Sequence, residues 1–175
     1  MPALPPTGAQ IPCNSLAINV PLQIRNKPVS VDFRGGWQHR VEPNPNDPIN
    51  SVRLRLIGFQ MTAEFPALEG KAKGGTITIE QSDGEADAVS LLKRSQLGYE
   101  CSLVMSPFTM VIQQPGSEPL VLYTKNQFTL IGQLTQYPPK GDEFQLQNPV
   151  DLSDLGNPDT VVATIQKFPV KVSGL

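Results

Sequence analysis

Apolar residues that recur at every second position are the feature that most constrains the fold of this chain. Val29, Val31 and Phe33 alternate with polar residues, and the same alternation returns in several later segments. Successive side chains of a β-strand point to opposite faces, so this period of two predicts half-buried strands. Strands are therefore expected in the ranges 16–24, 29–34, 51–65, 76–81, 108–113, 120–124, 128–136, 143–147 and 161–172.

The segment 51–65 contains a change of phase. Its apolar residues occupy even-numbered positions up to Leu56 and odd-numbered positions from Ile57 onward, and Gly58 stands beside the change. A phase change inside a strand is typical of a β-bulge. The segment is also long for one flat strand, so we expect a bent strand that passes from one part of a sheet to another.

Turn-forming residues separate these segments, because the chain of 175 residues contains 18 prolines and 14 glycines. Roughly eight to ten short strands at such spacing predict an all-β fold, in the first place a two-layer antiparallel β-sandwich of the jelly-roll type. A closed β-barrel with an apolar cavity is the alternative. One short helix is predicted at 85–96, because Asp83 can cap it and Leu91 and Leu92 lie on its apolar face.

The N-terminal part differs from the rest in its prolines and its lack of charge. Residues 1–15 are predicted to form an extended, Pro-rich arm, and 16–175 a single β domain. The first charged residue is Arg25, and no Lys or Arg precedes the apolar part, which argues against a signal peptide. A cytoplasmic location is expected, with non-classical export left open. No segment approaches the ~18 apolar residues of a membrane-spanning helix.

The residue inventory weighs against common catalytic and metal sites. A zinc site uses three or four nitrogen or sulfur ligands, whereas His39 is the only histidine and Cys13 and Cys101 are the only cysteines. We therefore expect no metal and no cofactor, and two free, buried thiols, with a disulfide between Cys13 and Cys101 left open as the alternative. His39 stands next but one to Trp37, and we expect it to be an exposed strand residue without a catalytic role. The chain is thus predicted not to be an enzyme.

Charge is distributed unevenly along the chain, although the net charge is only −2, which argues against nucleic-acid binding. The segment 25–55 is rich in arginine, and 141–160 contains acidic residues without a cation. The predicted interaction site comprises Arg34, Trp37, His39, Arg40, Arg53 and Arg55. Its predicted acidic counterpart comprises Asp142, Glu143, Asp151 and Asp154. These groups can pair within one chain, with Trp37 in the core, or join two copies head to tail.

The favoured function is that of a non-catalytic structural or assembly protein, which self-associates as a homo-oligomer or serves as a subunit of a larger complex. An uncharged, Pro-rich arm suits contact with a neighbouring protein. Two alternatives follow from the barrel fold: a protein that binds a small apolar ligand, and an isomerase or cyclase that uses carboxylates. A cavity with a polar group at its base would favour these alternatives over assembly.

Overall fold

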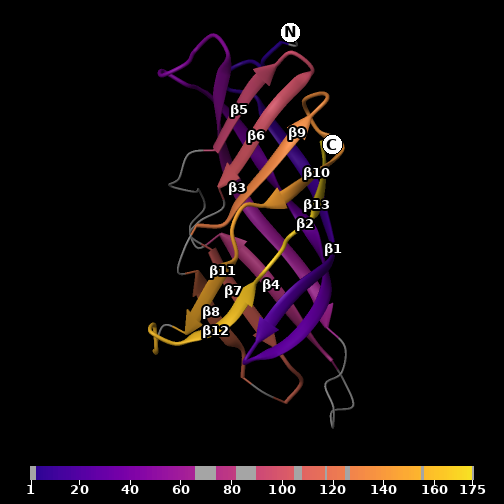
Figure 1. Ribbon diagram of the computed structural model, residues 1–175, viewed down its shortest axis with the longest axis vertical. Coiled ribbons are helices and arrows are strands. Elements are labelled where there is room, and N and C mark those ends of the chain that lie inside the picture. Colours follow the sequence, from indigo (N-terminus) through magenta and orange to yellow (C-terminus); the bar gives the residue numbers. More distant parts are fainter. Residues whose placement is uncertain are drawn as a thin grey trace.

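The computed structural model describes residues 3–65, 74–81, 90–104, 108–116, 118–124, 127–154 and 156–174. These residues form one antiparallel sheet of 13 strands without a helix (Figure 1), so the all-β antiparallel prediction is confirmed. Accordingly, no membrane-spanning helix is found in these ranges. The strands are β1 (Gln10–Ile24), β2 (Lys27–Pro43), β3 (Ser51–Phe65), β4 (Gly75–Gln81), β5 (Ser90–Ser95), β6 (Gly98–Val104), β7 (Phe108–Gln113), β8 (Leu120–Thr124), β9 (Thr129–Leu134), β10 (Lys140–Leu146), β11 (Val150–Asp154), β12 (Val161–Ile165) and β13 (Val170–Gly174).

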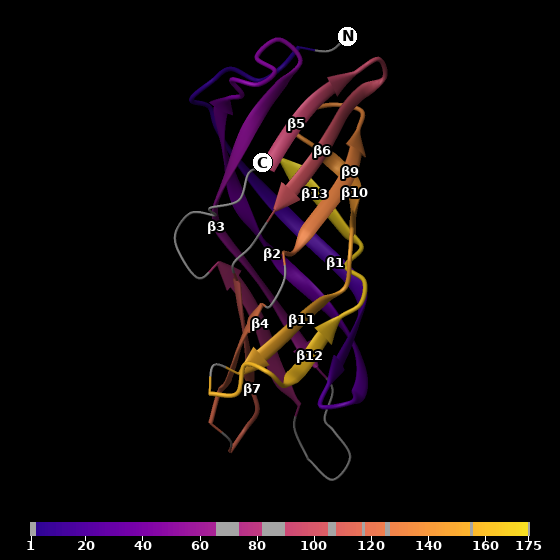
Figure 2. The ribbon, with the colours of Figure 1, turned by 60° about the vertical axis from the view of Figure 1, so that its left-hand side comes forward.

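The sheet closes on itself twice. Pairing of β12 with β1 completes the ring β1-β2-β3-β4-β7-β8-β11-β12, called here the lower barrel. Pairing of β3 with β5 completes the ring β1-β2-β3-β5-β6-β9-β10-β13, called here the upper barrel. The long strands β1, β2 and β3 belong to both rings and run the length of the molecule (Figure 2). Within the all-β class, the closed sheet corresponds to the predicted β-barrel alternative and not to the two separate sheets of a β-sandwich.

Strand β3 has the predicted bounds and the predicted bulge. Its register against β2 shifts so that Gly58 and Phe59 together lie opposite Trp37. Gly58 has a φ of 67°, which glycine adopts without steric cost. A bulge bends its strand and increases the local twist. The phase change in the sequence is therefore the point at which β3 turns from the upper into the lower barrel.

Strand β1 bends in the same way. Its register against β2 shifts between Ala17 and Val20. Within this bulge Asn19 has a φ of 55°, and its backbone N–H donates a hydrogen bond of 2.8 Å to the carboxylate of Asp32. Asparagine tolerates this left-handed conformation better than most residues do. Both strands that flank β2 are thus bent where the two barrels meet.

Two adjacent glycines allow these strands to approach each other closely. A Cβ atom on Gly35 would overlap the carbonyl oxygen of Gln60 on β3, and one on Gly36 would overlap that of Cys13 on β1. The backbones of β1 and β3 therefore approach β2 closely at this pair. Side chains at these positions would push β1 and β3 away from β2, because backbone atoms cannot move aside as a flexible side chain can.

The helix predicted at 85–96 is wrong over Ser90–Ser95, which form β5; residues 85–89 lie outside the described residues. Ser90 and Leu92 are buried while Leu91 and Lys93 are exposed, a strand period. The hydroxyl of Ser90 accepts a hydrogen bond of 2.8 Å from the backbone N–H of Val104. Pairing with β3 and β6 on either side outweighs the weak helical preference of this segment.

The N-terminal arm is shorter than predicted. Its last six predicted residues, 10–15, belong to β1 and pair with β2. Ahead of them, the Gly8 N–H donates to the carbonyl of Val41 at 2.8 Å, and the Val41 N–H donates to Ala9 at 2.9 Å. Leu4 packs against the core. Residues 3–9 therefore lie against the upper barrel of their own chain.

The interior is filled by aromatic side chains in continuous contact. Consecutive ring centroids lie 5.1–6.3 Å apart along a series of buried residues from three strands and two connecting segments. The series runs through Phe33, Phe168, Phe128, Phe108, Phe59 and Trp37. Tilted and edge-to-face contacts of this kind add to the free energy gained by burying the rings. The core is thus common to both barrels.

Candidate functional site

The predicted basic residues lie on the outer face of β2 and β3. Arg40 and Arg55 both form ion pairs with Glu42, at 3.4 Å and 3.1 Å. Arg53 lies opposite Glu42 in the strand register and is half-buried, and Arg34 is exposed further along β2. The structure therefore groups Arg40, Arg53 and Arg55 into one patch, called here the basic patch, with Glu42 as its single anion among the described residues.

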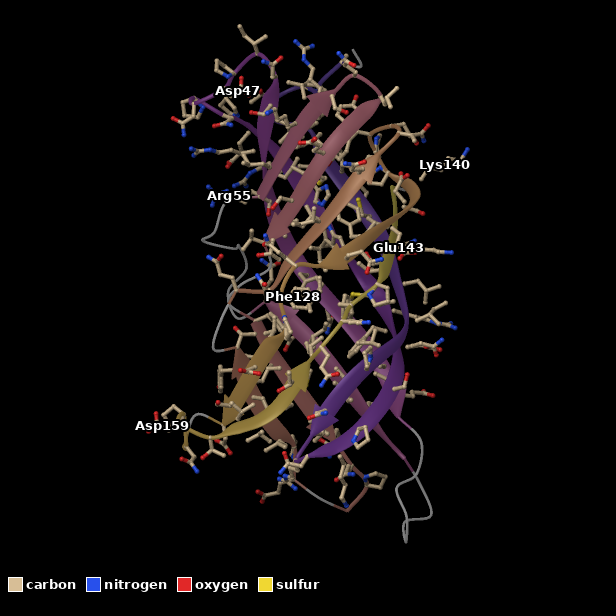
Figure 3. All side chains as sticks on the ribbon, viewed as in Figure 1. Asp47, Arg55, Phe128, Lys140, Glu143 and Asp159 are labelled. Atoms are coloured by element: carbon tan, nitrogen blue, oxygen red, sulfur yellow. The ribbon has the colours of Figure 1, made fainter. Side chains whose placement is uncertain are left out.

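The predicted acidic residues do not come together. Asp142 and Glu143 lie on β10 of the upper barrel, whereas Asp151 and Asp154 lie on β11 of the lower barrel. Figure 3 shows Arg55 and Glu143 on opposite sides of the molecule.

All four of these acidic side chains accept hydrogen bonds from nearby groups: Asp142 from the Lys140 N–H, Glu143 from the Gln145 side-chain amide, Asp151 from the Thr164 hydroxyl and Asp154 from the Gly156 N–H. Within the described ranges, the arginines pair with Glu42 and not with the predicted acidic residues. The intramolecular pairing proposed from the sequence is corrected accordingly. Glu42 is nearer in space because it shares a face with Arg40 two residues away on the same strand.

Trp37 and His39 are buried inside the upper barrel, so the expectation that His39 is an exposed strand residue is wrong. Both occupy inward positions of β2, where every second residue faces the core. The indole N–H of Trp37 donates to Nε2 of His39 at 2.6 Å. The other ring nitrogen of His39, Nδ1, lies 2.6 Å from the hydroxyl of Tyr137. We call this hydrogen-bonded series Trp37–His39–Tyr137 the buried relay.

The buried relay is uncharged. Burial lowers the pKa of His39 to about 3, so its imidazole is neutral near pH 7. Burial raises the pKa of Tyr137 above the usual phenol range, and the nearby thiols Cys101 and Cys13 raise it further. The phenol therefore keeps its hydrogen. These residues can form hydrogen bonds at neutral pH, but neither changes its charge there.

The two thiols are free and buried, as the sequence predicted. Burial raises the pKa of Cys13 to about 11 and raises that of Cys101 even further, with a smaller contribution from Cys13. The thiolate is the reactive form of cysteine, so both side chains are unreactive near pH 7. They line the core as small apolar groups.

A pocket of about 580 Å³ lies at the end of the upper barrel, beside the turn between β5 and β6. Its lining includes Tyr99, Leu134, Thr135 and Leu97, whose side chain is 93% exposed. The Tyr99 ring lies edge-on to that of Tyr137, with centroids 6.1 Å apart. One wall of this pocket, called here the mouth pocket, is thus in direct contact with the buried relay.

The N-terminal segment also reaches the mouth pocket. The hydroxyl of Tyr99 donates a short hydrogen bond to the carbonyl of Ala3. Burial raises the pKa of Tyr99, and the cation of Arg94 partly offsets that effect. Figures 1 and 2 show the N-terminus beside the tips of β5 and β6. The start of the chain therefore forms part of the rim at this end.

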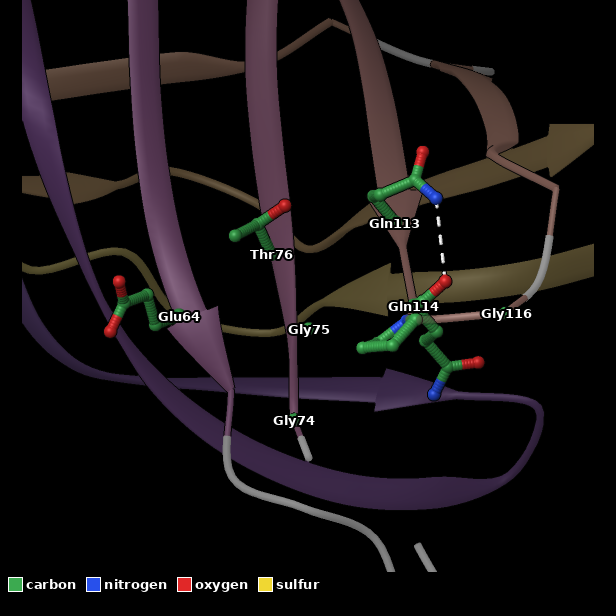
Figure 4. Close-up of a pocket in the computed structure, with 8 residues that line it drawn as sticks. Glu64, Gly74, Gly75, Thr76, Gln113, Gln114 and Gly116 are labelled. Carbon is green, nitrogen blue, oxygen red and sulfur yellow. Dashed lines mark hydrogen bonds between the residues drawn. The ribbon is translucent and has the colours of Figure 1, made fainter. Parts of the chain in front are cut away.

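Two further pockets lie away from the buried relay. One of about 480 Å³ lies at the end of the lower barrel, where Glu64, Thr76 and Gln113 come from the ends of β3, β4 and β7 (Figure 4). Another of about 550 Å³ lies on the outer face of the long strands, beside Asp32 and Arg34. Among the described residues that line them, none is aromatic. Only the mouth pocket, of these three, adjoins the buried relay.

Sequence reasoning selected Trp37 and His39 but missed Tyr137 and Tyr99. In the sequence, Tyr137 follows the predicted strand 128–136 and precedes Pro138, a position without a recognisable functional motif. Its distance of 98 residues from His39 leaves no local pattern that would link the two. The one available signal was that a lone histidine next to a buried tryptophan needs a polar partner.

The closed sheet makes the fold a β-barrel, and the mouth pocket lies at one end of it. No protein-family model matches the chain, and no curated protein matches its sequence. Among solved structures, DynF from the dynemicin biosynthesis pathway of Micromonospora chersina is similar, with a TM-score of 0.64 and 17% identity. The similarity covers 99% of this chain and 85% of DynF. At this identity it shows a shared fold.

Proposed function

We propose that this protein binds a small apolar molecule at the mouth pocket and holds it without converting it. The observation that carries the proposal is the contact between Tyr99, in the pocket wall, and Tyr137, the last member of the buried relay. Small-molecule sites typically measure about 300–1,000 Å³ and combine apolar walls with a few placed polar groups. The mouth pocket has that size, and its lining joins Leu97, Tyr99 and Leu134 to the polar residues Ser95, Gln96, Gln133 and Thr135.

Binding without turnover is supported by the protonation states of the relay. General acid–base catalysis is most efficient when the pKa of the group lies near the working pH. His39 has a pKa of about 3, and that of Tyr137 lies above the usual phenol range. Both groups therefore offer fixed hydrogen bonds rather than exchangeable protons. The fold likeness to a protein of a biosynthetic pathway agrees with a small-molecule ligand.

The exposed side chain of Leu97 provides the first test. We expect the neutral dye Nile red to bind the wild-type protein saturably and the Leu97→Glu variant at least about tenfold more weakly, because a carboxylate would lose hydration beside an apolar ligand. Fluorescence titration of the dye measures both affinities. The matched control is Ile49→Glu, which introduces the same charge at a side chain that is 71% exposed and outside the pocket lining. Absence of saturable binding, or equal weakening by both substitutions, would refute the proposal.

A second candidate function, self-association in which this surface contacts an acidic surface of another copy, is favoured by the basic patch. The Nε atom of Arg53 is buried and has no hydrogen-bond partner among the described residues. If copies associate through this patch, the double variant Arg53→Glu/Arg55→Glu should sediment as a folded monomer of 19.0 kDa while the wild-type chain sediments as a larger species. Analytical ultracentrifugation at low and high salt measures this difference. A wild-type mass of 19.0 kDa at low salt would rule out self-association.

A further inference from the structure

The segment that precedes β1 crosses the end of the upper barrel. At one end of this segment, Gly8 and Ala9 extend the ladder of β1 and bond to Val41 of β2. At its other end, the carbonyl of Ala3 accepts the hydrogen bond from Tyr99 of β6. In the ring of the upper barrel, β6 is the fourth strand from β1 in either direction, so β1 and β6 lie opposite each other. Residues 3–9, called here the strap, therefore span the opening of the barrel.

The strap lies over polar groups of the core. The next inward-facing residue after Val41 on β2 is His39, and the next after Tyr99 on β6 is Cys101, because every second residue of a strand faces the same side. Both side chains are buried. Leu4 of the strap packs against the same core. The strap thus separates these groups from the solvent at this end of the barrel.

Few contacts hold the free end of the strap. Pro5 and Pro6 have no N–H group to donate. Among the described residues, the strap makes one hydrogen bond besides those at its two ends, from the Ala9 N–H to the carbonyl of Pro6 at 3.2 Å, and this bond closes a turn within the strap itself. The free end therefore depends on the bond from Tyr99 and on the packing of Leu4. Strand β6, in contrast, is paired along both of its edges.

We propose that the strap opens about Gly8 as a gate while the barrel stays folded, and that it thereby controls the access of solvent and small molecules to the interior of the upper barrel. Gly8 has a φ of 91°, and a Cβ at this position would meet no atom within 4 Å. A glycine in open space can absorb a change of backbone angle, as a hinge requires. Segments with few contacts open at a lower free energy than the whole domain. The proposal does not depend on ligand binding at the mouth pocket.

The thiol of Cys101 reports whether the strap opens, because it is free and buried beneath the strap. The uncharged reagent dithiodipyridine forms a mixed disulfide with an accessible thiol and releases pyridinethione, whose absorbance gives the rate. Mass spectrometry of the digested protein separates labelling of Cys101 from that of Cys13. We expect Tyr99→Phe to raise the rate at Cys101 about tenfold, since it removes the donor of one hydrogen bond and retains the ring. The matched control, Tyr123→Phe on β8 of the lower barrel, should leave the rate unchanged.

Urea distinguishes opening of the strap from unfolding of the barrel. Opening exposes little surface, so the rate at Cys101 should hardly change at low urea concentrations, whereas a reaction that requires unfolding accelerates steeply. Leu4→Asp should raise the rate beyond that of Tyr99→Phe, because it places a carboxylate where an apolar side chain packs. A rate that is unchanged in both variants, or one that rises with urea as steeply as global unfolding does, would overturn the inference. Neither outcome bears on the binding of Nile red, which tests the proposed function separately.

Discussion

Phe128→Ala is expected to lower the free energy of unfolding by about 4 kcal/mol, the range seen when a fully buried phenylalanine is truncated. The ring of Phe128 is completely buried and lies 5.1 Å, between centroids, from both Phe108 and Phe168. Phe108 belongs to the lower barrel and Phe128 directly precedes β9 of the upper barrel. Figure 3 shows Phe128 near the middle of the molecule. Its removal would leave a cavity where the two barrels share their core.

Urea denaturation followed by the fluorescence of Trp37 and by circular dichroism measures this change. Ile49→Ala is the control, because a side chain that is 71% exposed should change the free energy of unfolding by less than about 0.5 kcal/mol. Phe128→Leu should fall between the two, since it refills part of the cavity. A loss of under about 1 kcal/mol for Phe128→Ala would show that the barrels do not depend on this contact.

Acid should destabilise the wild-type protein through His39. Burial lowers the pKa of this imidazole from 6.5 to about 3, so the unfolded chain binds a proton below pH 6.5 while the folded protein does not until about pH 3. The stability is therefore fully present above pH 6.5 and is lost as the pH falls toward 3. Between pH 7 and pH 4 the loss from this residue alone amounts to about 3 kcal/mol.

His39→Gln separates this effect from the titration of carboxylates. Glutamine does not titrate, and its amide can accept from Trp37 and donate to Tyr137. The free energy of unfolding of the wild-type protein minus that of the variant, from urea denaturation, should fall by about 3 kcal/mol from pH 7 to pH 4. Aspartates and glutamates titrate alike in both proteins and cancel in this difference. A difference that does not change with pH would show that His39 is not held neutral by the fold.

The strands that could be predicted from the sequence are those whose period of two is expressed locally. The bounds of β3, β7 and β8 agree with the predicted ranges, and the bulge at Gly58 was visible as a change of phase. The predicted strand 161–172 is instead divided into β12 and β13, which enter different barrels on either side of the buried Phe168. Strands β5, β6 and β11 were missed, although Tyr99, Cys101 and Leu103 of β6 alternate with polar residues over a short range.

Only half of the candidate site could be identified from the sequence. Trp37 and His39 were singled out as rare residues, yet they were assigned to an interaction surface rather than to the core. Their burial depends on the phase of β2, in which the odd-numbered residues from Trp37 to Val41 face inward. Glycines at two preceding positions obscured that phase, because a residue without a side chain contributes nothing to an apolar alternation.

By itself, the sequence determined the all-β class and the position of the main bulge, and it favoured free thiols over a disulfide. Each of these depends on residue type or on neighbours within a few positions, where side-chain direction and backbone freedom act directly. The tertiary structure alone decided the closure of β12 on β1 and of β5 on β3, and the meeting of His39 with Tyr137. These contacts join residues that no local period relates, and they form because backbone groups at a sheet edge and polar groups in a core must find partners.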